Sequence, residues 1–417
     1  MTSPPARGRE KIVQLMSKGV DIPNPSTVDI GEEVDVDHVS EQDVKIYPGC
    51  RIYGQETVIS AGCRIGSEGP ATIDDCRLGP KAELKGGYFF KSVFLDKAAL
   101  GSGAQVREGC ILEEEANGAH CVGLKQTILF PFVTLGSLIN FCDCLMAGGT
   151  SRRDHSEVGS SYIHFNFTPD GDKTTPSLIG DVPRGVMLNQ PPVFLGGQGG
   201  IVGPIRMGFG NVVAAHAILR SDYLEDGRLI VGKTPAAKTV RFKPRAYVHF
   251  RRVVANNIVY LGNLAALEEW YVHVRRPFLE AREFGRLIFA GLLEMLALAK
   301  RERIARLRAL AEKAAAGEES GPEADPDRAG KSEFRDRFSE IEGLFAPGPP
   351  DGPVERGRDD FLAGLEPFKG RGTDHVALIQ SLPAAVSGKG VAWLQGIVDG
   401  ICGKARSILP TLGLFGG

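Results

Sequence analysis

Aromatic residues are scarce in this sequence, and several other features that would mark a class of protein are missing. Aromatics make up 7% of the chain, with two Trp. The formal net charge is −2, which gives no electrostatic reason to expect nucleic acid or an anionic membrane as a partner. No apolar run approaches the roughly 20 residues of a membrane span, and the N-terminal "MTSPPARGREK" lacks the apolar region of a secretory signal. We therefore expect a cytoplasmic protein.

The eight cysteines form no pattern that indicates disulfides or a metal site. Cys50, Cys63 and Cys76 follow one another at intervals of 13 residues in turn-like contexts, which favours small residues of a repeat in a reducing compartment. Cys142 and Cys144 are the one close pair in the sequence, and they lack the second half of a zinc site. We expect no bound metal.

Glycine is abundant, at 53 of 417 residues, and it accompanies a period of six. Apolar residues recur at every sixth position in four stretches, often followed by Gly, Ser, Asn, Pro or Asp. These are Ile46, Ile52, Val58; Leu78, Leu84, Phe90; Phe94, Leu100, Val106, Leu112; and Leu195, Ile201, Met207, Val213, Leu219.

A period of six fits neither an amphipathic helix nor an isolated strand, which need spacings of 3 to 4 and of 2. It fits a short strand, a turn and the next short strand, so that three units close one triangular coil of about eighteen residues. Each sixth residue then points inward and stacks on its equivalents in neighbouring coils. The sequence predicts a mainly β protein with a parallel β-helix, and the hexapeptide class implies the left-handed kind.

Changes of pattern divide the chain into five regions. After residue 245 the apolar spacing becomes helical, and stretches rich in Pro, Gly and acidic residues interrupt it later. We predict an N-terminal helix with an extended lead-in at 1–27, the β-helix at 28–244 with an inserted loop at 164–176, a helical hairpin at 245–316 divided by Pro277, a flexible linker with a short helix at 317–357, and a small helical tail at 358–417. The hairpin is expected to pack on a coil end or on a partner subunit.

Three stretches of the β-helix region resemble one hexapeptide-repeat family. They are "VQLMSKGVDIPNPSTVDIGEEV", "QVREG" followed by "ILEEEANGAHCVGLKQTIL", and "HFNFTPDGDKTTPSLIGD". Their order and spacing are similar to the C-terminal half of bifunctional N-acetylglucosamine-1-phosphate uridyltransferase / glucosamine-1-phosphate acetyltransferases. The resemblance covers much of residues 13–240. It implies an acyltransferase in which three chains pack side by side, with acyl donor and acceptor meeting between them.

The resemblance also implies a set of substrate-binding residues. Arg107 and Lys125 fall on the residues that hold the sugar phosphate, Asn166 and Phe167 on an Asn-Tyr pair, and Lys173 on a loop lysine. Arg and Lys can neutralise a phosphate, and Asn can bind a sugar hydroxyl or amine. A solvated face of the coils is the plainer interpretation of Arg107 and Lys125.

The chain departs from this family where the chemistry needs a base. The family's histidine falls on Ser137, and its nearby tyrosine on Asn140. An amine that attacks a thioester must lose a proton, and serine alone cannot take it. His155 or His164 could substitute if either faces the cleft between subunits, although a histidine of a turn or loop is the plainer interpretation of each. Arg152 and Arg153, beside His155, could contact phosphates.

The polar insert 164–176 interrupts the period of six, and we interpret it as the place where the ligand site is built. The prediction is an acyltransferase-like homotrimer that takes acetyl-CoA or another acyl-CoA as co-substrate and a sugar phosphate or nucleotide sugar as acceptor. No nucleotidyltransferase domain is expected in this sequence. The alternative is a catalytically inactive β-helical trimer that binds a nucleotide sugar or scaffolds partners.

Overall fold

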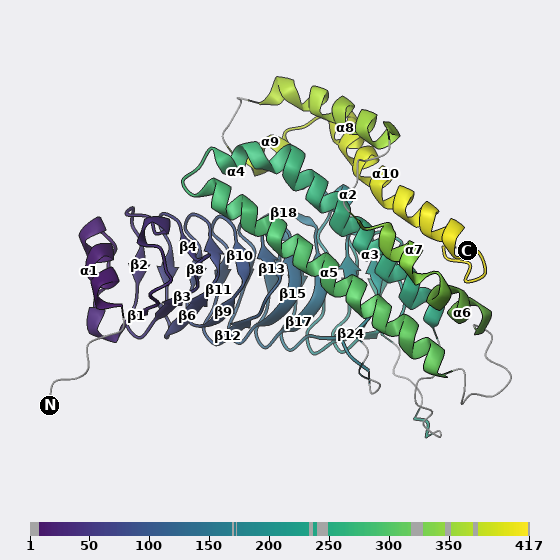
Figure 1. The fold of residues 1–417 in the computed structure, drawn as a ribbon, viewed down its shortest axis with the longest axis horizontal. Coiled ribbons are helices and arrows are strands. Elements are labelled where there is room, and N and C mark those ends of the chain that lie inside the picture. The colour runs from purple at the N-terminus through teal and green to yellow at the C-terminus, as the bar shows by residue number, and fades with distance from the viewer. Residues whose placement is uncertain are drawn as a thin grey trace.

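The computed structural model describes residues 8–168, 171, 173–232, 237–239, 249–317, 328–346, 352–369 and 374–415. They form a long solenoid of short parallel strands, and helices then lie along one side of it (Figure 1). The predicted fold class, a left-handed parallel β-helix followed by an α-helical region, is confirmed.

The solenoid has three faces, which we number for reference. Face 1 holds β1 (Asp29–Ile30), β3 (Arg51–Tyr53), β6 (Ala71–Asp74), β9 (Gly87–Phe90), β12 (Ala104–Val106), β21 (Ile163–Phe165), β24 (Gly200–Val202) and β27 (Ile218–Leu219). Face 2 holds β2 (Lys45–Ile46), β5 (Arg64–Ile65), β8 (Glu83–Leu84), β11 (Ala99–Leu100), β14 (Asn117–Gly118), β16 (Thr134–Leu135), β20 (Glu157–Val158), β23 (Phe194–Leu195), β26 (Val212–Val213) and β28 (Leu229–Ile230).

Face 3 holds β4 (Val58–Ile59), β7 (Arg77–Leu78), β10 (Ser92–Phe94), β13 (Cys110–Leu112), β22 (Ser177–Ile179) and β25 (Arg206–Met207). Faces 1 and 3 belong to one sheet because β15 (Gly123–Leu129) and β17 (Asn140–Met146) run across both. These strands turn the corner at Gln126 and Asp143, which have the positive φ of the left-handed region. A hairpin of β18 (Gly149–Ser151) and β19 (Asp154–His155) projects from the coil.

The six-residue period is a good guide to the interior. All five residues of the last stretch, from Leu195 to Leu219, are buried and stack in register with neighbouring coils. Two predicted inward positions are wrong by one residue. Phe89, not Phe90, is aligned with the inward residues of face 1, and Ile59, not Val58, is aligned with Leu78 on face 3. Where a corner is one residue shorter or longer, the interval between inward residues is no longer six, but the inward residues of neighbouring coils still align.

Face 3 buries residues on both sides of its strands. Its outward column contains Val58, Arg77, Val93, Ile111, Ile128, Leu145 and Leu178, all at 3% exposure or less, and it ends at the half-buried Arg206. Each aliphatic side chain buried in this way contributes roughly 1.5–3 kcal/mol. The outward residues of face 3 therefore require a cover, and the helices supply it.

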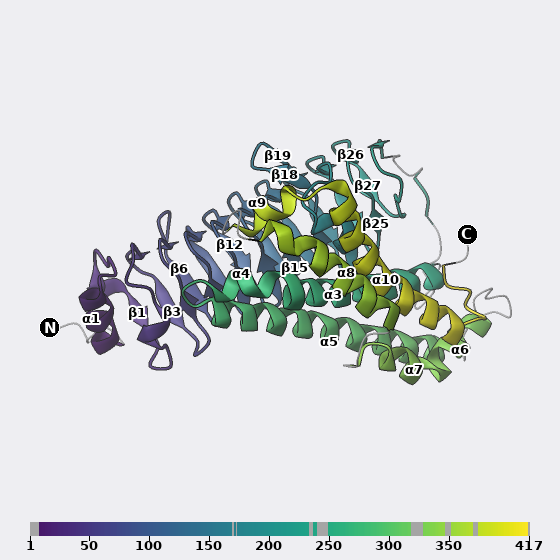
Figure 2. The ribbon, with the colours of Figure 1, turned by 90° about the horizontal axis from the view of Figure 1, so that it is seen from above.

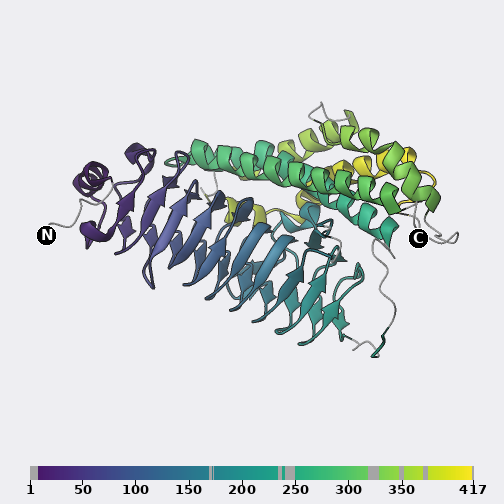
Figure 3. The same cartoon turned by 60° about the horizontal axis from the view of Figure 1, so that its bottom comes forward.

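The helical layer lies along face 3. It is built from α3 (Phe250–Trp270), a π-helical turn (Tyr271–Arg275), α4 (Arg276–Glu280) and the long α5 (Gly285–Gly317). Gly291 of α5 packs on Arg77 and Val93, and Arg77 pairs with Glu294 of α5 at 2.8 Å and with Glu56 at 2.9 Å. Figure 2 shows α3 and α5 running side by side along the solenoid, and Figure 3 shows the stacked strands with the helices on one side.

The remaining helices are α1 (Arg9–Lys18), α2 (Val182–Gly185), α6 (Arg328–Asp336), α7 (Phe338–Gly343), α8 (Gly352–Leu365), α9 (His375–Gln380) and α10 (Ala384–Ile408), with 3-10 turns at Pro25–Thr27, Val36–His38 and Glu366–Phe368. The α1 helix lies at the N-terminal end of the solenoid (Figure 1). Its last carbonyls accept from the N–H of Gly19, which has a φ of 108°, as expected for a C-cap.

The C-terminal regions differ from the predicted arrangement. The helical hairpin lies along face 3 of its own chain, whereas packing on a coil end or on a partner subunit was predicted. The break between its two helices follows α4, at residues 281–284, and does not lie at Pro277. The predicted linker contains α6, α7 and the start of α8, while 318–327 and 347–351 lie outside the described residues. The predicted small tail includes the 25-residue α10, which packs on α3 and α8.

Candidate functional site

Three of the predicted phosphate-binding cations gather around Cys142 on face 1. Arg107 follows β12, and its N–H donates to the carbonyl of Leu124 in the next coil, while Lys125 is paired in register with Cys142. Burial raises the pKa of the Cys142 thiol to about 11 and the Asp143 carboxylate acts in the same direction, whereas the positive charges of Lys125, Lys173 and Arg107 oppose them. The fold thus places all three cations close to one side chain.

One of these cations is partly neutralised within the chain. The Lys125 ammonium lies 2.7 Å from the Glu108 carboxylate, and both side chains remain about one-third exposed. Burial acts to raise the pKa of Glu108, but the hydrogen bond from Lys125 and the charge of Arg107 lower it overall. Arg107 itself is exposed. The site therefore keeps an excess of positive charge at the surface.

Helix α5 anchors the insert. The Arg303 guanidinium lies 2.6 Å from one carboxylate oxygen of Asp143 and also donates to the carbonyl of Lys173, at 3.0 Å. Asn166 Nδ2 donates to the other Asp143 oxygen at 3.2 Å. Burial raises the pKa of Asp143, and the charge of Arg303 opposes that effect. Asn166 and Lys173 are thus brought together through one buried ion pair.

Helix α3 holds the end of the same insert. Asn257 Nδ2 donates to the carbonyl of Thr174 at 3.1 Å. Phe167, at the start of the insert, is 66% exposed, and Asp170 and Asp172 lie outside the described residues. The insert therefore contacts helices of its own chain, which the sequence did not predict.

His164 lies inside the solenoid. Its side chain is 1% exposed, is aligned with Ile201 in the inward column of face 1 and places its Nε2 2.8 Å from the Ser177 hydroxyl. Burial lowers the pKa of His164 to about 3. The condition attached to this residue, that it face a cleft between subunits, is not met because its ring points into the core.

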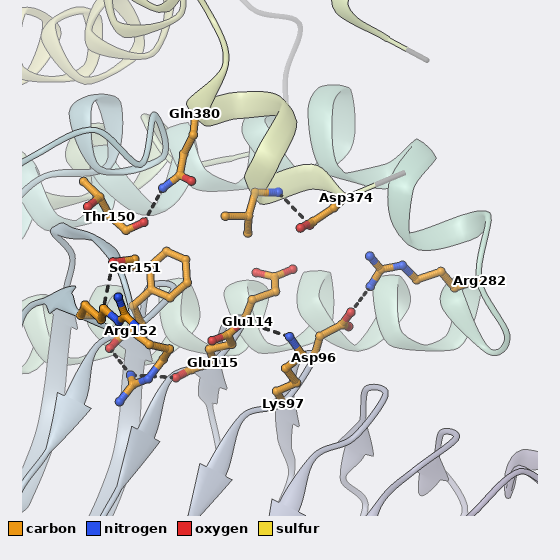
Figure 4. A pocket seen from close by; sticks show the side chains of 13 residues that line it. Asp96, Lys97, Glu114, Glu115, Thr150, Ser151, Arg152, Arg282, Asp374 and Gln380 are labelled. Atoms are coloured by element: carbon orange, nitrogen blue, oxygen red, sulfur yellow. Dashed lines mark hydrogen bonds and ion pairs between the residues drawn. The ribbon is translucent and has the colours of Figure 1, made fainter. Parts of the chain in front are cut away.

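The hairpin residues belong to a different corner, between faces 3 and 2. Arg152 and Arg153 line a cavity of about 440 Å³ together with residues of the solenoid corner, Arg282 and the α9 segment (Figure 4). Arg152 donates to the carbonyls of Phe132 and Glu115 at 2.7 and 3.2 Å. His155 Nδ1 lies 3.0 Å from the Arg152 carbonyl. The predicted site residues thus fall into two separate groups.

Charged groups beneath this cavity join the helices to the solenoid. Arg275 pairs with the buried Glu114 and lies 2.9 Å from His375 Nδ1, and Tyr271 donates to Glu113 at 2.5 Å. Burial raises the pKa of Glu113 to about 7, against the charge of Arg275. Most of these groups have partners within the cluster, which fits an anchor for the helical layer.

A pair that the sequence did not predict lies at the corner of faces 2 and 1. His120 Nδ1 is 3.0 Å from the hydroxyl of Ser137, the residue on which the family's histidine falls. His120 is exposed and Ser137 is half-buried. The two residues are 17 positions apart, as are the aligned Lys125 and Cys142. This common interval was the available indication that they would be neighbours.

Within the described ranges, no group of three His, Cys, Asp or Glu side chains is placed to hold a metal ion. The described helices include none that is both long and apolar enough to cross a membrane. The described cysteines are all free thiols.

Comparison with known proteins gives matches over about half of the chain. No protein-family model matches it. The bifunctional protein GlmU of Thermotoga maritima is 29% identical over 212 residues, which are 51% of this chain and 42% of that protein. GlmU of Fervidobacterium nodosum is 27% identical over 221 residues, 52% of this chain and 43% of that protein. The matched region thus spans less than half the length of these relatives. With its coils in register, the chain is a hexapeptide-repeat β-helix protein that resembles GlmU.

Proposed function

We propose that this protein transfers an acyl group from acetyl-CoA or another acyl-CoA to a sugar phosphate or nucleotide sugar on face 1. The observation that carries the proposal is the placement of Arg107, Lys125 and Lys173 near Cys142. Lys125 is aligned with Cys142, the Arg107 N–H donates to Leu124, and Arg303 joins the Lys173 carbonyl to Asp143. Three cations near one point can take up a phosphate dianion. The similarity to GlmU supports an acyltransferase-type β-helix protein.

The neighbouring groups suit the sugar that would carry this phosphate. The Asn166 amide can both donate and accept, as a sugar hydroxyl or amine requires. Its hydrogen bond to Asp143 fixes its position. Because Asp143 is held by Arg303, the amide is oriented before a ligand arrives, which lowers the entropy cost of binding. No metal is required for acyl transfer from a thioester in this scheme.

Exposed apolar residues on the last coils support assembly into a homotrimer. Phe194, Val212 and Leu229 are aligned on consecutive coils of face 2 and are 40%, 43% and 71% exposed. Ile163 and Phe165 on face 1 are each 38% exposed. Helices already cover face 3, so faces 1 and 2 remain for contacts between subunits. The candidate site on face 1 would then lie beside a subunit interface.

An assay of thiol release tests the proposal. The full-length protein is incubated with acetyl-CoA and glucosamine 1-phosphate, and free CoA is measured with a thiol reagent. We expect release that depends on the acceptor. It should fall at least about tenfold in an Arg107→Gln/Lys125→Gln variant, because the variant loses two cations that would hold the phosphate, and a factor of ten corresponds to about 1.4 kcal/mol. Arg51→Gln, an exposed arginine on face 1 in an earlier coil, is the matched control. Acceptor-independent release, or equal loss in the control, would contradict the proposal.

A β-helical protein that binds a nucleotide sugar without chemistry, or scaffolds partners, is the second candidate. Its support is that Ser137 and Asn140 stand where the resembling family has its histidine and tyrosine, and serine alone cannot take the proton that acyl transfer releases. Calorimetry distinguishes the two functions. Sugar-phosphate binding without binding of acetyl-CoA favours the ligand-binding function, and binding of neither favours the scaffold.

A further inference from the structure

His120 and Ser137 form a hydrogen-bonded pair at one end of the face 1 strands that carry the candidate site. His120 precedes β15, which contains Lys125, and Ser137 precedes β17, which contains Cys142. Five residues separate the members of each pair in sequence, so an extended chain places them no more than about 17 Å apart. The pair and the cations therefore border the same strip of face 1.

The other histidines of the β-helix are less suited to act at this strip. His38 lies in the first coil at the N-terminal end of the solenoid, far from β15. His164 is buried inside the solenoid, and His155 lies on the hairpin at the corner of faces 3 and 2. His216 is exposed at the corner of faces 2 and 1, but it precedes β27, four coils beyond β15, or about 19 Å along the stack. His120 is the exposed histidine that lies in the coil of Lys125.

We propose that His120 is the general base of the acyl transfer and that Ser137 is its positioning residue. This rests on the proposed function. In the tautomer in which Nδ1–H donates to Ser137 Oγ, the lone pair of Nε2 is available to a substrate, because the hydrogen bond of one ring nitrogen fixes the state of the other.

The proton balance of the step is simple. The acceptor amine attacks the thioester carbonyl, the N–C bond forms, and His120 Nε2 takes the proton that the nitrogen loses. The C–S bond breaks, CoA leaves as the thiolate, and the proton held by His120 passes to that sulfur to give the thiol. General base catalysis of this kind contributes about 10²–10⁴-fold to a rate.

The test measures the pH dependence of acyl transfer by the full-length protein with acetyl-CoA and glucosamine 1-phosphate. His120→Gln is expected to lower kcat by at least about 100-fold, with KM values for both substrates nearly unchanged, and to remove the acid limb of the kcat/KM profile. Ser137→Ala is expected to retain activity at a lower rate with a displaced acid limb. His216→Gln, at the same corner, is the control and should match the parent protein.

Two outcomes would overturn the inference and can be told apart. If the parent protein transfers acetyl groups and His120→Gln keeps its rate and pH profile, His120 is not the base, while the proposed function stands. If the parent protein transfers nothing, the proposed function fails and the assignment of His120 fails with it. Circular dichroism melts of each variant identify a loss of folding, and in that case His120→Asn replaces His120→Gln in the same assay.

Discussion

The Arg303 guanidinium on α5 lies 2.6 Å from the Asp143 carboxylate at the corner of faces 1 and 3, and both side chains are at least 96% buried. The same guanidinium donates to the backbone of the insert at Lys173, and the same carboxylate accepts from Asn166. A residue of the C-terminal helices thus fixes the polar loop that interrupts the solenoid. The candidate site on face 1 therefore depends on Arg303, which lies outside residues 13–240, the part of the chain that carries the resemblance.

Replacing Arg303 by Leu should lower the free energy of unfolding by about 3–5 kcal/mol, because it leaves the Asp143 carboxylate buried without its partner. Urea unfolding measures the change, and hydrogen exchange should show faster exchange in 164–176. Arg306→Ala removes a partly exposed i,i+4 pair with Glu302 from the same helix and should cost less than about 1 kcal/mol. Equal effects of the two variants would contradict the anchoring role.

The outward column of face 3 should behave as protein core. Ile111→Ala is expected to lower the free energy of unfolding by about 2–5 kcal/mol, as for other large-to-small changes at buried sites. Gln105→Ala, at an exposed outward position of β12 on face 1, should change it by no more than about 0.5 kcal/mol. A small effect at Ile111 would mean that the helical layer does not cover face 3 in solution.

The buried His164 should make the protein sensitive to acid. Burial lowers its pKa in the folded state to about 3, below the value of 6.5 for a free histidine. The unfolded chain therefore binds more protons as the pH falls below 6.5, and stability present above that pH is lost by up to about 1.4 kcal/mol per pH unit down to about 3. Denaturant midpoints from pH 7 to 4 should fall less steeply in His164→Gln than in the parent protein. Parallel profiles would contradict this account.

The Cys142 thiol can report on the charge of the candidate site. In a Cys121→Ser/Cys402→Ser background, Lys173→Gln should raise the pKa of Cys142 further, because it removes one of the positive charges that favour the thiolate. Alkylation by iodoacetamide at pH 9 should slow by about twofold or more, since the thiolate is the reactive form. Lys389→Gln, on α10, should leave the rate unchanged. An unchanged rate in Lys173→Gln would place that lysine away from the site.

The aligned apolar residues of face 2 make assembly testable. The parent chain should sediment at about three times its mass of 44.8 kDa, and Val212→Lys should shift it toward the mass of one chain, because it introduces a charge into an apolar contact. Glu157→Gln, an outward residue of the same face two coils earlier, is the control. A parent protein that sediments as a single chain would refute the trimer.

The interior of the solenoid could be predicted from sequence because stacking demands an apolar residue at equivalent positions of every coil. Leu195 and Val213, on face 2, belong to one such column, and both were predicted correctly. Counting by six failed at Phe90, where a corner shortens the interval between inward residues to five, from Leu84 to Phe89. The length of each corner therefore decides how many residues separate successive inward positions, and that length need not give an interval of six.

The cover of face 3 was not predicted, although the sequence contains its indication. Strands of face 3 carry two adjacent apolar residues, as in Val93–Phe94 and Ile111–Leu112. A strand with one side exposed to water would instead alternate apolar and polar residues. The pairs of Arg303 with Asp143 and of Tyr271 with Glu113 could not be predicted, because they join positions about 160 residues apart. No periodicity relates a helix to the coil on which it packs.

A helix laid lengthwise on a solenoid constrains how such a protein can evolve. Coils are about 4.8 Å apart, while a helix rises 1.5 Å per residue and completes a turn in 3.6 residues. Loss of one coil between Arg77 and Asp143 would leave Glu294 and Arg303 of α5 about three residues out of phase with their partners. A solenoid without such a helix can gain or lose coils. Here the two ion pairs of α5, at Glu294 and at Arg303, fix the number of coils between Arg77 and Asp143.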